Sequence, residues 1–95
     1  MNTDAQVEQS RTVSLLNRRG LHARASAKFV TLASGLPCQV EVEKDGSRVS
    51  GTSIMGLMML GAACGDTIVL HAQGGGAEEA LDSLTALVED RFGED

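Results

Sequence analysis

The strongest constraint on the fold of this chain is the order in which two hydrophobic patterns follow one another. Apolar residues that alternate with polar ones are typical of strands, whereas apolar residues three and four positions apart are typical of helices. Strand-like segments are found at residues 11–17, 38–44, 47–51 and 66–72, and helix-like segments at residues 22–34, 53–60 and 77–92. The order is therefore strand, helix, strand, strand, helix, strand, helix.

This order predicts one kind of architecture. The pair Asp45-Gly46 separates the second and third strand-like segments, and Asp-Gly between two short strands is a strong hairpin signal. Four short strands with enough helix to cover one face predict an α+β fold. We therefore expect a βαββαβα open-faced sandwich, with a four-stranded, mostly antiparallel sheet covered on one face by helices. The patterns do not give the order of the strands in the sheet.

The length of 95 residues allows a single domain. We expect residues 1–10, which are polar and lack a hydrophobic pattern, to form a flexible N-terminal tail, residues 11–92 to form the domain, and residues 93–95 to form a C-terminal tail. The chain has no Trp or Tyr and only two Phe. Its core is therefore expected to be aliphatic and rich in methionine.

The net charge of the chain indicates which kinds of partner it does not bind. With 8 basic and 13 acidic residues the net charge is −5, which argues against nucleic acid and against anionic membranes. The chain shows no secretory signal, and no apolar run approaches the roughly 20 residues that span a bilayer, so we expect a cytoplasmic protein.

The two cysteines are not expected to hold a metal or cofactor. Cys38 and Cys64 are isolated, and reduced thiols packed as small apolar groups are the expectation. A metal site would have to gather both cysteines with His22 and His71 from four separate elements.

The stretch "NRRGLHARASAKF", residues 17–29, places His22 where a strand-like segment gives way to a helix-like one. The first N–H groups of a helix have no partner within it, and together with the helix dipole they attract anions. Arg24 offers a guanidinium fork for a phosphate or carboxylate, and Lys28 lies one turn further on. Four of the eight basic residues lie within residues 18–28. From spacing alone two readings stay open: a nucleophile within an anion site, or a histidine that merely caps a solvated helix.

The stretch "TSIMGLMML", residues 52–60, is a second unusual feature. Leu57 and Leu60 suffice to face a core, so we expect the other large apolar residues to form a small exposed patch: Ile54, Met55 and Met58. The alternative is a helix covered on both faces by a loop. Ser53 precedes the helix and is its natural N-cap.

Two further features are expected to be structural. His71 alternates with Ile68 and Leu70, so it should lie on the opposite, solvent-exposed face of its strand. Gly74 to Gly76 should reverse the chain into the last helix, because no Lys-Ser/Thr follows them as a phosphate-binding loop would require.

Two motifs, "GLHARASAKF" and "TSIMGLMMLGAACGD", resemble those of the histidine-containing phosphocarrier family, HPr, of the phosphoenolpyruvate-dependent phosphotransferase system. The resemblance covers about residues 11–92, and "NRRGLHARA" is similar to the nitrogen-type branch, NPr. It implies a βαββαβα sandwich whose histidine accepts a phosphoryl group from Enzyme I and passes it to an EIIA-type domain. Such a protein is a monomeric relay without a cofactor, and not an enzyme acting on a small molecule.

Carried over by position, the resemblance makes His22 the phosphoacceptor through Nδ1, and makes Ala23 and Arg24 the phosphate cradle. Ser53 matches the regulatory serine that HPr kinase/phosphorylase modifies in some bacteria. The implied docking surface consists of Leu21, Arg24, Lys28, Ile54, Met55 and Met58. Two positions depart from the family pattern: Ala25 replaces a common proline, which should leave the helix start intact, and Thr52 replaces a common lysine, which weakens the expectation of a kinase site.

Two other functions remain as alternatives. A small hydrolase or transferase would use His22 as a general base, but it needs an orienting carboxylate and a pocket, and only cationic residues lie nearby in the sequence. A regulatory domain would bind a small anion at the helix start without chemistry, and its affinity would survive the substitution His22→Gln.

Overall fold

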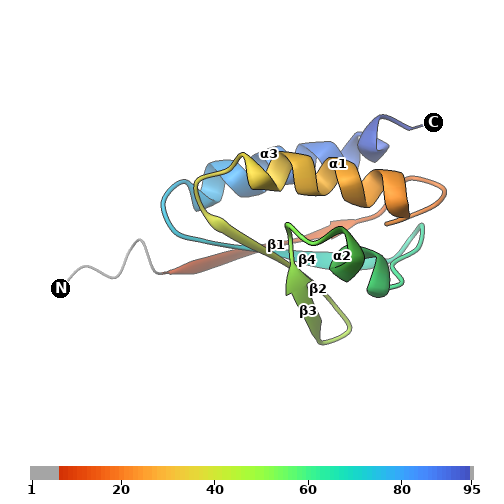
Figure 1. The fold of residues 1–95 in the computed structure, drawn as a ribbon, viewed down its shortest axis with the longest axis horizontal. Coiled ribbons are helices and arrows are strands. Elements are labelled where there is room, and N and C mark those ends of the chain that lie inside the picture. Colours follow the sequence, from red (N-terminus) through yellow and green to blue (C-terminus); the bar gives the residue numbers. More distant parts are fainter. Residues whose placement is uncertain (1–6, 95) are drawn as a thin grey trace.

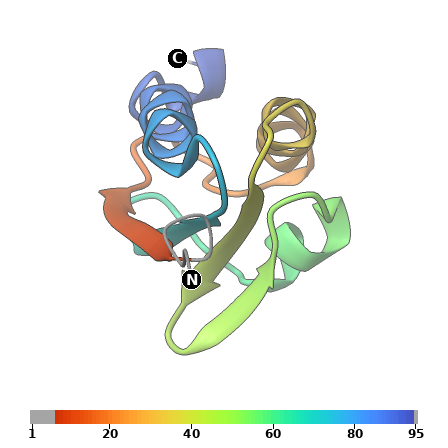
Figure 2. The same cartoon turned by 90° about the vertical axis from the view of Figure 1, so that its left-hand side faces the viewer.

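The computed structural model describes residues 7–94, and its elements follow the predicted order. The strands are β1 (Glu8–Ser14), β2 (Gln39–Lys44), β3 (Ser47–Ser50) and β4 (Thr67–Gln73). The helices are α1 (Ala23–Ser34), α2 (Ile54–Met59) and α3 (Ala77–Glu89), and a 3-10 turn, η2 (Arg91–Gly93), follows α3. The strands form one antiparallel sheet in the order β1-β4-β2-β3, and the helices cover one of its faces (Figures 1 and 2). The predicted open-faced sandwich is confirmed.

The hairpin between β2 and β3 is the turn that the sequence predicts. Asp45 has φ 51° and Gly46 has φ 87°, and two successive left-handed residues are the signature of the two-residue turns whose twist suits a hairpin.

The core lies between the sheet and the helices and is almost entirely aliphatic. Fully burying one such side chain stabilises the fold by about 1.5–3 kcal/mol. Residues with 0–1% exposure include Leu15, Ala25, Phe29, Val42, Leu57, Ile68, Leu70, Leu81, Leu84, Val88 and Phe92. The two phenylalanines of the chain are both in this core, whereas Met55, Met58 and Met59 are exposed, so the expectation of a methionine-rich core is wrong.

The first strand begins earlier than predicted. Glu8, Gln9 and Ser10 pair with Gln73, Ala72 and His71 of β4, so the prediction of a tail over residues 1–10 is wrong for these three. Their polar character does not prevent strand formation, because β1 is an edge strand and backbone pairing with β4 holds it. Residues 1–6 lie outside the described part of the chain.

The last helix ends earlier than predicted. Arg91 (φ 57°) and Phe92 (φ 54°) are left-handed, so α3 stops at Glu89 and a turn follows. The turn keeps Phe92 fully buried and sends the chain back toward α1. The predicted C-terminal tail is therefore wrong for Gly93 and Glu94, and Asp95 lies outside the described residues.

Cys38 is half-buried and Cys64 is exposed, and both thiols are free. Within residues 7–94 no cluster of three or more His, Cys, Asp or Glu is suited to a metal ion. In the same range no helix is long and apolar enough to cross a membrane.

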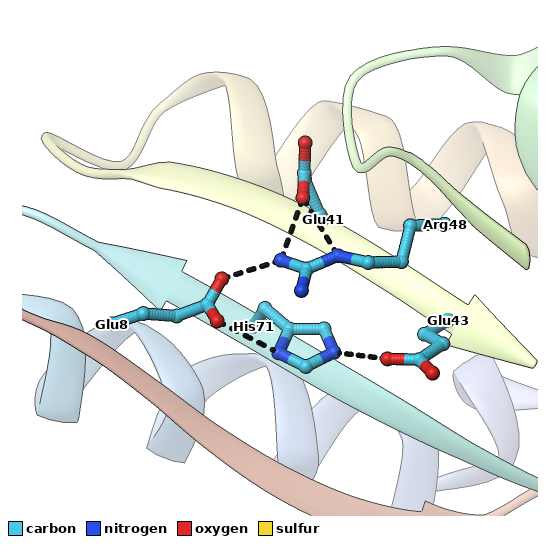
Figure 3. A network of polar contacts seen from close by, with 5 residues as sticks. All are labelled: Glu8, Glu41, Glu43, Arg48 and His71. Carbon is cyan, nitrogen blue, oxygen red and sulfur yellow. Dashed lines mark hydrogen bonds and ion pairs between the residues drawn. The ribbon is translucent and has the colours of Figure 1, made fainter. Parts of the chain in front are cut away.

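His71 lies on the uncovered face of the sheet, as predicted, but it is only 8% exposed and not solvent-exposed. Its Nε2 is 2.7 Å from Glu43 Oε1, and its Nδ1 is 3.6 Å from Glu8 Oε2. Arg48 pairs with Glu8 and with Glu41 beside it (Figure 3). The charged side chains of three neighbouring strands therefore lie over the imidazole and exclude water from it.

This network predicts an acid-sensitive contribution to stability. A hydrogen bond from Arg48 lowers the pKa of Glu8 below its usual value. A carboxylate whose pKa is lower in the folded state stabilises the fold above its unfolded pKa, and that stabilisation is lost as the pH falls through the folded pKa. We expect Glu8→Gln to lower the urea midpoint at neutral pH and to match wild type at an acidic pH below the lowered pKa of Glu8, where that carboxylate is protonated in the folded state as well. Glu89→Gln, at an exposed carboxylate of α3, is the control; a deficit of Glu8→Gln that is equal at both pH values would contradict the prediction.

Candidate functional site

The turn that precedes His22 is fixed by backbone contacts with the loop after α2. The amide of Leu21 donates to Ala62 O at 3.0 Å, and the amide of Gly65 donates to Leu15 O at 2.8 Å. Gly20 has φ 62°, and a Cβ there would lie 2.3 Å from Ala62 O. Only glycine fits both the left-handed conformation and this close approach.

We expect Gly20→Ala to lower the free energy of unfolding by about 3 kcal/mol, because left-handed strain and the backbone clash add. Gly61→Ala is the matched control, since Gly61 has a similar φ of 64° but open space around the added methyl group. The control should lower the free energy of unfolding only by the left-handed backbone strain, about 1–2 kcal/mol. Urea unfolding of the two variants measures the difference, and equal losses would show that the clash is relieved at no cost.

His22 occupies the N-cap position of α1 with an extended backbone (φ −75°, ψ −178°), and its side chain makes no capping hydrogen bond. The first bond within the helix runs from the Ser26 amide to His22 O at 2.8 Å. The amides of Ala23 and Arg24 come before it and have no partner within the helix. Ala25 is fully buried in the core, so the helix starts as expected without the common proline.

Basic side chains surround this helix start. Arg18, Arg19 and Arg24 are exposed and line, with His22 and Glu94, a surface hollow of about 330 Å³. Lys28 is directed elsewhere: its Nζ donates to Phe92 O at 2.6 Å. The predicted positive region is therefore built by three arginines, while Lys28 ties α1 to the turn after α3.

A carboxylate contacts the histidine, contrary to expectation. Glu94 Oε2 lies 2.6 Å from His22 Nε2, and Glu94 Oε1 accepts from Asn17 Nδ2 at 3.1 Å. Burial raises the pKa of Glu94, but the hydrogen bonds from Asn17 and His22 outweigh it, and the net pKa is lowered. No local pattern could have revealed Glu94, because it lies 72 positions from His22. It reaches the site because α3 and η2 end beside the start of α1, at the same end of the molecule (Figure 1).

The exposed patch on α2 is confirmed, and the alternative of a helix covered on both faces is wrong. Leu57 is fully buried, whereas Ile54 is 41%, Met55 70% and Met58 41% exposed. Met59, which the sequence pattern did not indicate, is 79% exposed. These four residues form what we call the α2 patch, and α2 lies beside α1 (Figures 1 and 2).

The structure also shows the positions of two further residues that the resemblance named, Ser53 and Leu21. Ser53 caps α2, since its Oγ accepts from the Gly56 amide at 2.9 Å. Leu21 is 4% exposed and belongs to the core. The prediction that Leu21 contacts partners is wrong, because its side chain packs inward between the helices and the sheet.

The first amides of α1 have no partner within the helix, His22 lies at its cap and three arginines lie around it. In a small α+β sandwich protein this arrangement is suited to holding an anion such as a phosphoryl group. The chain matches the family model described as "PTS HPr component phosphorylation site" over residues 9–90. It belongs to the HPr family, the phosphocarrier proteins of the phosphotransferase system.

Individual relatives agree with this assignment. The chain is 46% identical to a phosphocarrier protein HPr of Cupriavidus necator over 84 residues, covering 88% of this chain and 94% of the relative. It is 39% identical to a phosphocarrier protein NPr of Shewanella violacea, over 88% of this chain and 92% of the relative. The crystal structure of HPr-C-His from Thermoanaerobacter tengcongensis superposes with a TM-score of 0.87 at 44% identity, over 92% of this chain and 98% of that one.

Proposed function

We propose that His22 accepts a phosphoryl group from phosphorylated Enzyme I and passes it to an EIIA-type domain, as a monomeric relay in the cytoplasm. The observation that carries this proposal is the position of the imidazole at an open helix N-terminus, within a hollow that Arg18, Arg19 and Arg24 also line. These groups supply the positive potential that a transferring phosphoryl group requires.

The transfer is an in-line displacement. The lone pair of His22 Nδ1 forms a bond to phosphorus while the bond from phosphorus to the donor's nitrogen breaks and its electron pair returns to the donor. The Arg24 guanidinium and the amides of Ala23 and Arg24 form the cradle that holds the negative charge on the phosphoryl oxygens. Passing the group to the acceptor reverses these roles.

The α2 patch is the proposed docking surface, and we include Arg24 in it because α1, which carries Arg24, packs beside α2. Exposed methionines adapt to more than one partner, so donor and acceptor would use the same surface by turns. Lys28 contributes less than the sequence implied, because its ammonium group is engaged by Phe92 O.

The test is the intact mass of the wild-type chain after incubation with phosphoenolpyruvate and Enzyme I from the same organism. We expect the addition of one phosphoryl group that is lost in mild acid, since phosphohistidine is acid-labile, and that is removed by an added EIIA-type domain. No gain in mass with a demonstrably phosphorylated Enzyme I would refute the proposal.

Ser53 is proposed as a regulatory phosphorylation site for an HPr kinase/phosphorylase. A negative charge at this position keeps the cap of α2, because carboxylates and phosphates are good N-cap groups, but it places charge beside the apolar α2 patch.

We expect Ser53→Asp to remain folded and to raise the KM for phosphorylated Enzyme I roughly tenfold, the effect of about 1.4 kcal/mol. The control is Ser83→Asp, at an exposed serine of α3. Steady-state phosphorylation rates measure both. If Ser53→Asp accepts phosphate as fast as wild type at limiting protein concentration, the regulatory role is abandoned.

A further inference from the structure

The contact between Glu94 and His22 determines which imidazole nitrogen carries a proton. An ionised carboxylate can only accept hydrogen bonds, and Glu94 Oε2 lies 2.6 Å from His22 Nε2. Nε2 must therefore be the protonated nitrogen. In the neutral ring the lone pair is then on Nδ1, the nitrogen that Glu94 does not engage.

Asn17 fixes the carboxylate in turn, and its own orientation follows from chemistry. One end of the Asn17 amide lies 2.8 Å from Gly20 O and 3.1 Å from Glu94 Oε1. Both of these oxygens are acceptors, so the group that faces them must be the NH₂ group. Asn17 is completely buried, which leaves its side chain no freedom to turn away.

The backbone around Glu94 is built to present it. Arg91 and Phe92 both adopt left-handed conformations, Phe92 is completely buried, and Lys28 Nζ holds Phe92 O at 2.6 Å. The amide of Glu94 donates to Arg91 O at 2.9 Å. Unfavourable backbone conformations persist where the surrounding structure enforces them, and here they direct a carboxylate onto the histidine.

We propose that Asn17 and Glu94 are positioning residues that hold the proton of His22 on Nε2 and so make Nδ1 the phosphoryl acceptor. This inference rests on the proposed function of His22. When the bond from Nδ1 to phosphorus forms, Nε2 keeps its proton and the ring gains positive charge, which the Glu94 carboxylate balances. The pair therefore both selects the attacking nitrogen and stabilises the phosphorylated ring.

The arrangement makes an unusual prediction for two variants. In Glu94→Gln the carbonyl oxygen must face the Asn17 NH₂ group, so the new NH₂ group faces His22 Nε2. A donor at that place requires the lone pair on Nε2 and moves the proton to Nδ1. Glu94→Ala removes the partner without imposing the wrong tautomer. If Glu94 had only a structural role, the order of the two losses in rate would be the opposite. The isosteric Glu94→Gln would then lose less phosphorylation rate than Glu94→Ala.

The experiment combines imidazole ¹⁵N NMR of the unphosphorylated full chain with its rate of phosphorylation by Enzyme I. We expect protonated Nε2 in wild type, protonated Nδ1 in Glu94→Gln, and a mixture in Glu94→Ala. The rate should fall about 10–100-fold in Glu94→Gln and less in Glu94→Ala. Asn17→Ala should also give a mixture, and Glu89→Gln is the control for charge near the end of α3.

Two results would overturn the inference: the wild-type tautomer in both Glu94 variants, or a lower phosphorylation rate for Glu94→Ala than for Glu94→Gln. The NMR arm needs no Enzyme I. Wild type could show the proton on Nε2, and Glu94→Gln could move it to Nδ1, while wild type is never phosphorylated. In that case the placement of the proton by Glu94 stands, and the role of His22 as phosphoryl acceptor fails.

Discussion

His22→Ala is expected to abolish acid-labile phosphorylation by Enzyme I, a loss of more than about 10³-fold, because no other group at the site can replace the imidazole as nucleophile. The fold should persist, since the His22 side chain makes no capping bond and its hydrogen bond joins it to Glu94. Intact mass in mildly alkaline solution, with circular dichroism of the same sample, measures both properties.

His71→Gln is the matched control, because it removes the only other histidine of the chain. His71 is buried beneath the charged network of the open sheet face, between Glu8 and Glu43, and cannot reach a phosphoryl donor. This variant should lose stability but retain phosphorylation. Phosphorylation that survives in His22→Ala would refute the acceptor role.

The anion-sensing alternative is separated by His22→Gln. A domain that only binds an anion keeps its affinity when a polar side chain replaces the histidine, whereas a carrier loses its function. Titration with inorganic phosphate and phosphorylation by Enzyme I therefore give opposite results for the two hypotheses.

Features that depend on neighbours in the chain could be predicted from the sequence. The start of α1 at His22 follows from the change of hydrophobic pattern, and the β2–β3 turn follows from Asp45-Gly46. Ser53 caps α2, and Ile54, Met55 and Met58 are exposed, because a six-residue helix has only one face to bury. In each case the physical cause lies within a few residues.

Features that depend on distant residues could not be predicted. The central position of β4 follows from its pairing with both β1 and β2, which no local pattern encodes. His71 is buried by side chains from strands that are far apart in sequence. Glu94 reaches His22 only because the chain turns back at Arg91 and Phe92, against the usual backbone preference. The sequence therefore singled out His22 but not the carboxylate that contacts it.

Arg24→Gln is expected to slow phosphoryl transfer by about 10²–10³-fold while the KM for Enzyme I changes little, because removing one fixed donor to the developing charge acts on the transition state. Arg24 lies in the first turn of α1, beside amides that have no partner within the helix, so its guanidinium can contact the same oxygens. Arg24→Lys keeps the positive charge but loses the paired N–H donors of the guanidinium. Its rate of phosphoryl transfer should therefore lie between those of wild type and Arg24→Gln.

Arg19→Gln is the matched control, since Arg19 lines the same hollow but precedes the helix. An arginine that only attracts the donor acts through the long-range field, and its effect shows in the KM and fades with added salt. We therefore expect Arg19→Gln to match wild type at high ionic strength, whereas the loss in Arg24→Gln persists there. Single-turnover rates at low and high salt measure this difference. If the two variants behave alike, Arg24 contributes only to the general positive potential, and the stabilisation of the phosphoryl group falls to the amides of the helix start.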